Sequence, residues 1–310
     1  MLKPRSAVRT VVAGALLIAT PAFADEALFG YLYTTETLPK GVFEYEQWAT
    51  ANYKQSQGTY LGLPLRSEIE YGVTDTFQAA LYLNYSYVRA FANNPFGETS
   101  GPGVPNNADP NATYRRWRLD GVSAEFIYRI LSPYKDPFGF ALYLEPTWGS
   151  QESELEAKLL FQKNFLDDRL VLAANVIFEW SREKQTGGFG LPPDDPGAAP
   201  STEKETQFEV ALGASYLFAP GWRAGIEYRN VNHYAGAYSF SNSNKEWQAS
   251  YLGPNIHYGS KKWWITFTAL GQLPAGHAYN EEFQENTVNR RVYGSGGTRY
   301  AFRMRLGVYF

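Results

Sequence analysis

Carboxylate side chains recur in this sequence as pairs separated by one residue. Glu-x-Glu stands at 44–46, 68–70 and 154–156. In a β-strand, residues two apart point to the same face, so each pair would present two carboxylates to one surface. Such a surface suits a hard cation such as Ca²⁺, or ion pairs with basic side chains. No loop carries a complete set of metal ligands, so we predict no metal site. We also predict no cofactor and no catalytic residue.

The three histidines offer little for nucleophilic catalysis. Acyl transfer needs a Ser–His pair with a third, orienting group. His257 precedes a short turn and His277 falls in a long polar stretch. His233 is expected at the end of a strand, where Asn230 and Asn232 are near and no serine nucleophile adjoins it. No Gly-rich phosphate loop opens a helix, so nucleotide binding is not supported.

The first residues predict export. Lys3, Arg5 and Arg9 precede an apolar run at 11–19, and "PAFA" at 21–24 provides a small-x-small cleavage site. We therefore interpret residues 1–24 as a Sec signal peptide. The whole chain has a formal charge of −3 and no cysteine, and removing the basic leader makes it more acidic. An acidic exported chain without disulfides fits a bacterial envelope protein and argues against nucleic-acid binding.

Strand-like alternation runs through the rest of the chain. In "YAFRMRLGVYF" (300–310) every second residue is apolar, whereas Arg303 and Arg305 fall between them. About twelve segments share this period of two, which indicates strands with one apolar face and one polar face. Short turns alternate with longer links, three of which are long polar stretches at 91–113, 184–205 and 274–298. We expect these three loops to be exposed and mobile.

This plan predicts an all-β fold, a transmembrane antiparallel up-and-down barrel of about twelve strands. Short turns would lie on the periplasmic rim and long loops on the extracellular rim. The barrel would span residues 41–310, after a periplasmic N-terminal lead segment at 25–40. The 16% aromatic content suits rings at a membrane–water boundary.

The final strand resembles that of outer-membrane β-barrel proteins of Gram-negative bacteria. The resemblance implies an outer-membrane location, contact with the lipid bilayer, passage with periplasmic chaperones, and recognition by the barrel-assembly machinery. The residues that would carry this C-terminal signal are Phe302, Met304, Leu306, Val308 and Phe310. "TLPKGVFEYEQW" (37–48) is also similar to the opening of uncharacterised outer-membrane transporter and porin-like families.

If the apolar set faces lipid, the polar set must line the lumen. Closing the barrel in register would put Glu46 opposite Arg305 and near Arg66, Trp48 opposite Arg303, and Glu44 opposite Glu68. The candidate lumen residues are Glu44, Glu46, Arg66, Glu68, Glu70, Glu125, Glu145, Glu156, Lys158, Glu179, Glu209, Glu227, Arg229, Arg303 and Arg305.

Two interpretations of this lumen remain open. The charges select solutes in a pore, or they pair with one another and stiffen a closed barrel. We expect a monomeric, porin-like channel or transporter for small hydrophilic solutes. The alternative is a structural or adhesive barrel with its lumen closed by ion pairs. The third interpretation is a hydrolase with its site at the extracellular rim.

Overall fold

The computed structural model describes residues 27–294 and 297–310, and the predicted signal peptide (1–24) lies outside them. Within these residues the chain forms a closed barrel of 12 long antiparallel strands, which confirms the predicted fold class. The strands are β1 (Phe43–Tyr53), β2 (Thr59–Thr74), β3 (Phe77–Phe91), β4 (Tyr114–Leu131), β5 (Gly139–Gly149), β6 (Glu152–Phe165), β7 (Leu170–Gln185), β8 (Ser201–Ala219), β9 (Trp222–Ala235), β10 (Lys245–Gly259), β11 (Trp263–Gln272) and β15 (Tyr300–Tyr309).

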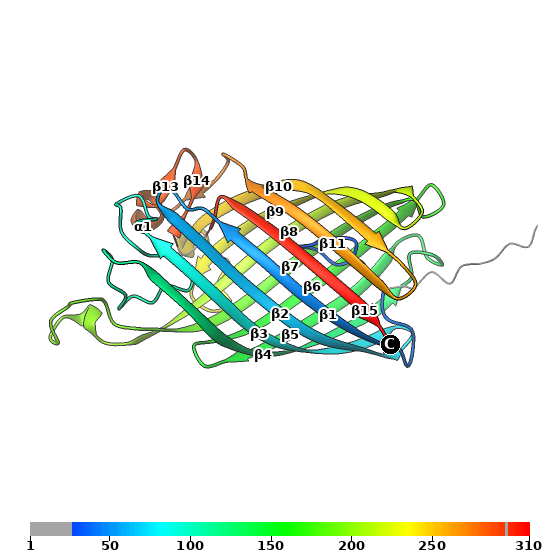
Figure 1. The fold of residues 1–310 in the computed structure, drawn as a ribbon, viewed down its shortest axis with the longest axis horizontal. Helices are drawn as coiled ribbons and strands as arrows, with labels where there is room; N and C mark the ends of the chain where they lie inside the picture. The colour runs from blue at the N-terminus through cyan, green and yellow to red at the C-terminus, as the bar shows by residue number, and fades with distance from the viewer. Residues whose placement is uncertain (1–26, 295–296) are drawn as a thin grey trace, which may run out of the picture.

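The last strand closes the barrel by pairing with both the first strand and the one before it. β15 pairs with β1 from Glu44↔Tyr309 to Tyr53↔Tyr300, and its other side pairs with β11. Figure 1 shows β1 and β15, blue and red, lying side by side along the tilted wall. Closure leaves none of the 12 long strands in the described part of the chain with an unpaired edge. A membrane-spanning sheet requires this because lipid cannot hydrogen-bond to the backbone.

Alternation along each strand separates the lipid-facing side from the lumen-facing side. In β3, Gln78, Ala80 and Tyr82 are buried, while Leu81 and Leu83, which alternate with them, are exposed. An exposed leucine belt is unfavourable in water and favourable in hydrocarbon, so the apolar side of the wall faces the bilayer. This is the architecture of outer-membrane barrels. Among the described residues, no helix is both long and apolar enough to span a bilayer.

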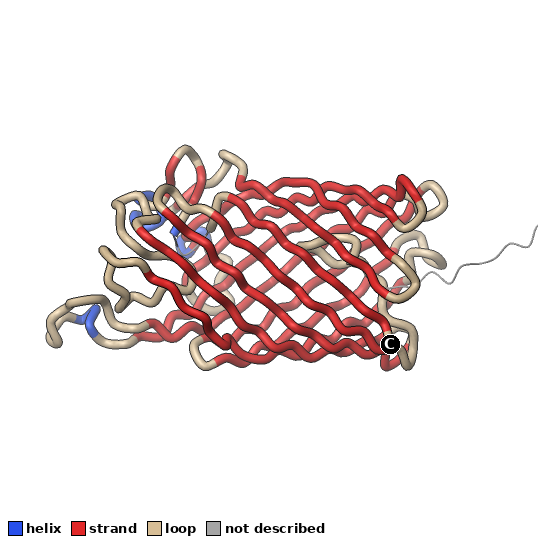
Figure 2. Tube along the Cα trace, in the orientation of Figure 1, coloured by secondary structure: helices blue, strands red, loops and turns tan. Residues whose placement is uncertain are grey.

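The two rims differ as the loop lengths predict. Figure 2 shows tight turns and the C-terminus at one end and long tan loops at the other. Short elements lie within the long loops, namely 3-10 turns at Pro196–Ala198 and Asn242–Asn244, the helix α1 (Glu281–Glu285), and the two-residue strands β12 (His277–Ala278), β13 (Thr287–Val288) and β14 (Arg291–Val292).

The longest outer loop is not simply exposed, as the sequence had suggested. Two glutamines tie it across the barrel mouth: Gln55 Nε2 donates to the carbonyls of Gly294 and Gly297, and Gln272 Nε2 donates to Val292. Val292 is fully buried as a result. The loop contributes apolar side chains to the cluster at the mouth, and burying them outweighs the preference of its many polar residues for water.

Most of the described part of the predicted lead segment lies inside the barrel. Residues 28–38 run through the lumen with Phe29, Leu32 and Leu38 almost fully buried. The sequence predicts a periplasmic lead segment at 25–40, whereas residues 28–38 of it lie within the lumen. The reason is tertiary: inward side chains of several distant strands bind the segment, and no local pattern within it indicates those partners.

Candidate functional site

Inward polar side chains hold the backbone of this N-terminal segment, residues 28–38, along much of its length. The carboxylate of Glu227 (β9) accepts from the N–H groups of Gly30 and Tyr31 at 2.9 and 2.8 Å. Asn175 (β7) accepts from the N–H of Tyr33 at 2.7 Å and donates to its carbonyl at 2.9 Å.

Two glutamines continue this attachment further along the segment. Gln162 (β6) accepts from the N–H of Thr35, and Gln78 (β3) accepts from the N–H of Leu38, each at 2.8 Å. Buried backbone donors need partners. Here the wall's side chains provide them, because residues 28–38 form no strand of their own.

A glycine in the wall makes room for the segment. A Cβ built on Gly213 (β8) would lie 2.6 Å from Cε1 of Phe29 and 3.1 Å from Cδ1 of Leu32. Phe29 and Leu32 pack in one buried cluster with Ala173 and Ala211 of the neighbouring wall. The lumen at this level is therefore shaped around the segment, and any larger side chain at position 213 would displace Phe29.

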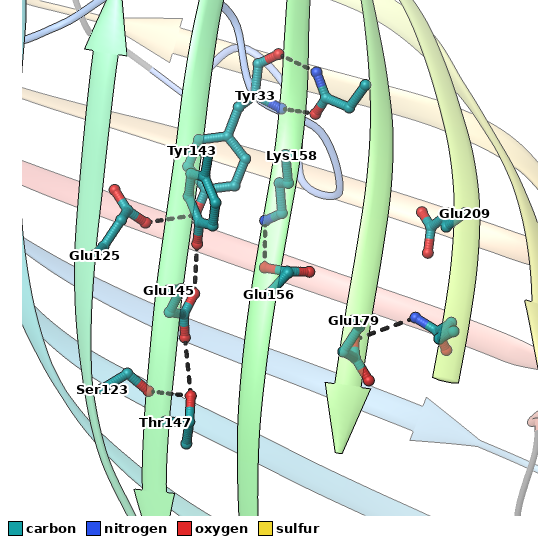
Figure 3. Close-up of polar contacts among 12 residues, drawn as sticks. Tyr33, Ser123, Glu125, Tyr143, Glu145, Thr147, Glu156, Lys158, Glu179 and Glu209 are labelled. Atoms are coloured by element: carbon teal, nitrogen blue, oxygen red, sulfur yellow. Dashed lines mark hydrogen bonds and ion pairs between the residues drawn. The ribbon is translucent and has the colours of Figure 1, made fainter. Parts of the chain in front are cut away.

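The two tyrosines of the segment lie against cationic side chains. The Arg303 guanidinium carbon is 4.0 Å from the centroid of the Tyr31 ring, and that of Arg229 is 4.8 Å away. Lys158 Nζ lies 4.4 Å from the Tyr33 ring. Figure 3 shows Tyr33 beside Tyr143 with Lys158 next to both rings. Such cation–π contacts are worth about 0.5–2 kcal/mol each, depending on desolvation.

Ion pairs fill much of the remaining lumen. Arg305 Nη2 lies 2.9 Å from Glu46 Oε2, and both side chains are nearly inaccessible. Arg229 forms a two-pronged contact with Glu209, through Nε at 2.6 Å and Nη2 at 2.5 Å. The other pairs are Arg66–Glu145, Lys158–Glu156 and Arg129–Glu36, of which the last also holds the N-terminal segment.

The strand register is shifted by two residues from the predicted one. Trp48, not Glu46, lies opposite Arg305 in the closing pair, and Thr50 lies opposite Arg303. On the other side of β1, Glu46 faces Glu68 directly. The stagger of barrel strands sets this register and turn positions alone do not reveal it.

The same shift corrects the two remaining register predictions. Trp48, not Glu46, lies opposite Arg66, and Glu44 lies opposite Glu70 instead of Glu68. The predicted Glu46–Arg305 pair still forms, as a diagonal contact between neighbouring strands.

All of the predicted lumen residues are buried or half-buried on the inward face. The buried ones are Glu44, Glu46, Glu68, Glu70, Glu125, Glu145, Lys158, Glu209, Glu227 and Arg305, and the half-buried ones are Arg66, Glu156, Glu179, Arg229 and Arg303. Whether any of them contacts a solute stays a prediction.

The predicted assembly signal lies on the opposite face of β15. Phe302, Met304, Leu306, Val308 and Phe310 are half-exposed or exposed. The ring of Phe310 stacks on Phe43 of the first strand with centroids 6.0 Å apart. The assembly role of these residues stays a prediction.

The candidate lumen residues predicted from the sequence do not include the aromatic side chains that point inward. Trp48, Tyr82 and Tyr143 are buried in the lumen, where their polar atoms bond to carboxylates. Their parity on the strands was the available signal: Trp48 and Tyr143 each lie two residues from an inward glutamate, and Tyr82 lies two residues from the inward Asn84. The inward amides of Gln162 and Asn175 were likewise visible in the pattern, but nothing in it showed what they bind.

The histidines lie where the strand assignment puts them, and His233 has acidic neighbours. His233 Nε2 is 3.1 Å from Glu205 Oε2, and its Nδ1 is 3.0 Å from Glu246 Oε2. The ring also stacks on Trp247. With both ring nitrogens engaged, His233 has none left to act as a base on a substrate in this arrangement.

Solved structures share the fold at low sequence identity. An outer-membrane channel from Pseudomonas putida F1 aligns over 89% of this chain and 98% of its own, with a TM-score of 0.56 and 10% identity. The NanC porin aligns over 86% and 98%, with a TM-score of 0.47 and 10% identity. The β domain of the Bordetella autotransporter BrkA aligns over 87% and 100%, with a TM-score of 0.48 and 12% identity. The first of these supports the barrel fold.

The sequence itself has one matching family model. No curated protein gives a significant match. The model described as "Family of unknown function (DUF6662)" matches residues 21–310, which include the whole barrel and the N-terminal segment. The chain therefore belongs to the DUF6662 family.

Proposed function

We propose that this barrel is an outer-membrane channel for small hydrophilic solutes, gated by its own N-terminal segment. The observation that carries the proposal is the way residues 28–38 are held. Side-chain hydrogen bonds and cation–π contacts bind the segment, whereas the wall is held by continuous backbone pairing. Each such hydrogen bond contributes only about 0.5–1.5 kcal/mol net, or about 1.5–3 kcal/mol where the acceptor is the Glu227 carboxylate. The segment can therefore leave while the barrel stays intact.

A lumen vacated by the segment would be lined by polar and charged groups. Glu227, Asn175 and Gln162 would lose the backbone groups that satisfy them and would face water. Arg303 and Arg229 would lose the ring of Tyr31. A hydrated lumen with both signs of charge suits hydrophilic solutes and would select among them by charge.

Single-channel recording in planar bilayers tests the gate. Gly213→Leu adds bulk where Phe29 packs and should push the segment out without altering it, so we expect longer and more frequent openings than in the wild type. Ala214→Leu is the matched control, because it adds the same bulk to the adjacent residue on the lipid-facing side of β8. Equal open times and opening frequencies in the wild type and both variants would refute gating by the segment.

The outer loop is tested in the same recordings. Replacing Gln55 and Gln272 by alanine removes the hydrogen bonds that tie Val292, Gly294 and Gly297 across the mouth. We expect this change to increase conductance further when it is combined with Gly213→Leu. In the opened channel, Arg305→Ala or Glu46→Ala should alter ion selectivity, and unchanged selectivity would contradict their role in lining the pore.

The second candidate is a structural barrel that never conducts. The ion pairs across the lumen favour it, above all the inaccessible pair of Arg305 and Glu46. A barrel of this kind would show no steady openings even in the variant that combines Gly213→Leu with the two glutamine changes. The recordings therefore decide between the two candidates.

A further inference from the structure

A group of buried carboxylates lies on the inward face of β1, β2 and β4, next to the ion pair of Arg305 and Glu46. Glu46 faces Glu68, and Glu44 faces Glu70, directly across the β1–β2 pair. Like charges that face each other across strands are destabilising. Glu125 joins them from β4, and all five side chains are at most 2% exposed.

A small residue lets carboxylates from non-adjacent strands meet. The register places Glu70 opposite Ala80 of β3, and Ala80 in turn opposite Glu125 of β4. The methyl group of Ala80 leaves space above β3, so the longer side chains on each side can approach one another. One carboxylate oxygen each from Glu68, Glu70 and Glu125 lies within 4.8 Å of the other two.

The hydrogen bonds around this group leave negative charge uncompensated. Glu70 accepts from Gln78 Nε2 at 3.1 Å, and Glu125 Oε2 accepts from the hydroxyls of Tyr82 and Tyr33. Neither oxygen of Glu68 has a hydrogen-bond partner among the residues that the structure describes, and the same holds for Glu125 Oε1. A buried charge without a partner costs several kcal/mol, so the group must either take up a proton or bind a positive charge.

We propose that Glu68, Glu70 and Glu125 bind a hard divalent cation of the Ca²⁺ type. Carboxylate oxygens are the ligands that such ions prefer, and Ca²⁺–oxygen distances of about 2.3–2.6 Å allow two ligand oxygens to lie up to about 5 Å apart. The observed spacing fits this limit. Mg²⁺ needs shorter bonds and keeps several waters, which suits an enclosed site less well.

The group of Glu205, His233 and Glu246 at the outer rim provides a useful contrast. Its ligand atoms are equally close, but the imidazole stands between the two carboxylates and bonds to both. Those three side chains satisfy one another. Glu68, by contrast, is directed at two other acids, and a cation would supply the missing partner.

The site does not depend on the proposed channel function. Tyr33 of the N-terminal segment donates to Glu125 at 3.1 Å, so the segment covers the site, and the ion would enter during folding or while the segment is displaced. A barrel that never conducts would bind the ion equally well. Loss of ion binding and loss of gating are therefore separate outcomes.

The experiment uses the mature chain refolded into detergent without lipopolysaccharide, in the presence of Ca²⁺ or of EDTA, and then desalted. Elemental analysis should find about one Ca²⁺ per chain after refolding with Ca²⁺, and the thermal unfolding midpoint should be higher than after refolding with EDTA. Glu68→Gln should weaken retention by more than about tenfold, since even outer-shell changes have effects of that size. Glu179→Gln, another inward glutamate, is the matched control and should retain the ion.

A second variant keeps every carboxylate. Ala80→Leu fills the space over which Glu70 and Glu125 meet, and it should abolish Ca²⁺ retention while circular dichroism still reports a folded barrel. In EDTA, Glu68→Gln should unfold at a higher temperature than the wild type, because one repelling charge is gone. If the wild type retains no more Ca²⁺ than Glu68→Gln, the carboxylates are neutralised by protons and the proposal is overturned.

Discussion

Asn175 and the backbone of Tyr33 form a reciprocal pair of hydrogen bonds inside the barrel. The side-chain oxygen of Asn175 accepts from the Tyr33 N–H, and its amide nitrogen donates to the Tyr33 carbonyl, at 2.7 and 2.9 Å. Asn175 is fully buried. One side chain thus satisfies both the N–H and the carbonyl of Tyr33, in a segment that does not pair with a strand through its backbone. This makes the pair a central anchor of the N-terminal segment.

The first prediction concerns that anchor. Asn175→Ala removes both hydrogen bonds and leaves the buried N–H and carbonyl of Tyr33 without partners, so the free energy of unfolding should fall by about 1–3 kcal/mol. Urea unfolding followed by tryptophan fluorescence measures this loss. Asn106→Ala, in an exposed loop, is the control and should change little. An equal loss in both variants would argue against a specific anchor.

The ring of Tyr31 provides the second prediction. Arg303 and Arg229 both lie over it, while its hydroxyl has no hydrogen-bond partner among the described residues. Tyr31→Leu keeps apolar bulk but loses the π face, and stability should fall by about 1–2 kcal/mol. Tyr31→Phe keeps the face and should behave as the wild type does. Destabilisation by Tyr31→Phe as large as by Tyr31→Leu would assign the effect to the hydroxyl.

The third prediction uses the inaccessible pair of Arg305 and Glu46. Arg305→Met leaves the Glu46 carboxylate buried without its guanidinium partner, so the free energy of unfolding should fall by about 3–5 kcal/mol. Adding Glu46→Gln removes that charge and should restore most of the loss. A double-mutant cycle in urea gives the coupling energy. Additive effects of the two changes would show that the pair contributes no coupling.

The fourth prediction tests which face of the wall meets lipid. Leu81 lies in the first half of β3 and is 69% exposed. Leu81→Arg should destabilise the barrel in a bilayer by up to about 2–4 kcal/mol, the cost of a charge at the membrane midplane. Phe96→Arg, at a 60% exposed position in the long loop after β3, should cost much less. Equal costs would place Leu81 outside the hydrocarbon region. Reversible folding into lipid vesicles supplies the measurement.

Much of the wall was predictable from the sequence because alternation is a local property. The apolar residues of 300–310 and the paired glutamates at 44–46 and 68–70 each indicated a strand and its two faces. The loop lengths then indicated which strand ends lie at the rim with short turns and which lie at the rim with long loops. Strand register was not predictable within two residues, because hairpin turns fix it only loosely and barrel stagger adds to every pairing. Trp48 therefore lies where Glu46 was expected.

The sequence by itself determined a twelve-stranded barrel, its apolar exterior and its charged lumen, because these follow from a period of two and the exclusion of unpaired backbone from lipid. Only the tertiary structure decided what the lumen contains. Residues 28–38 carry no signal of their destination. Their partners Glu227, Asn175 and Gln78 come from three separate strands, and they converge only once the barrel is closed.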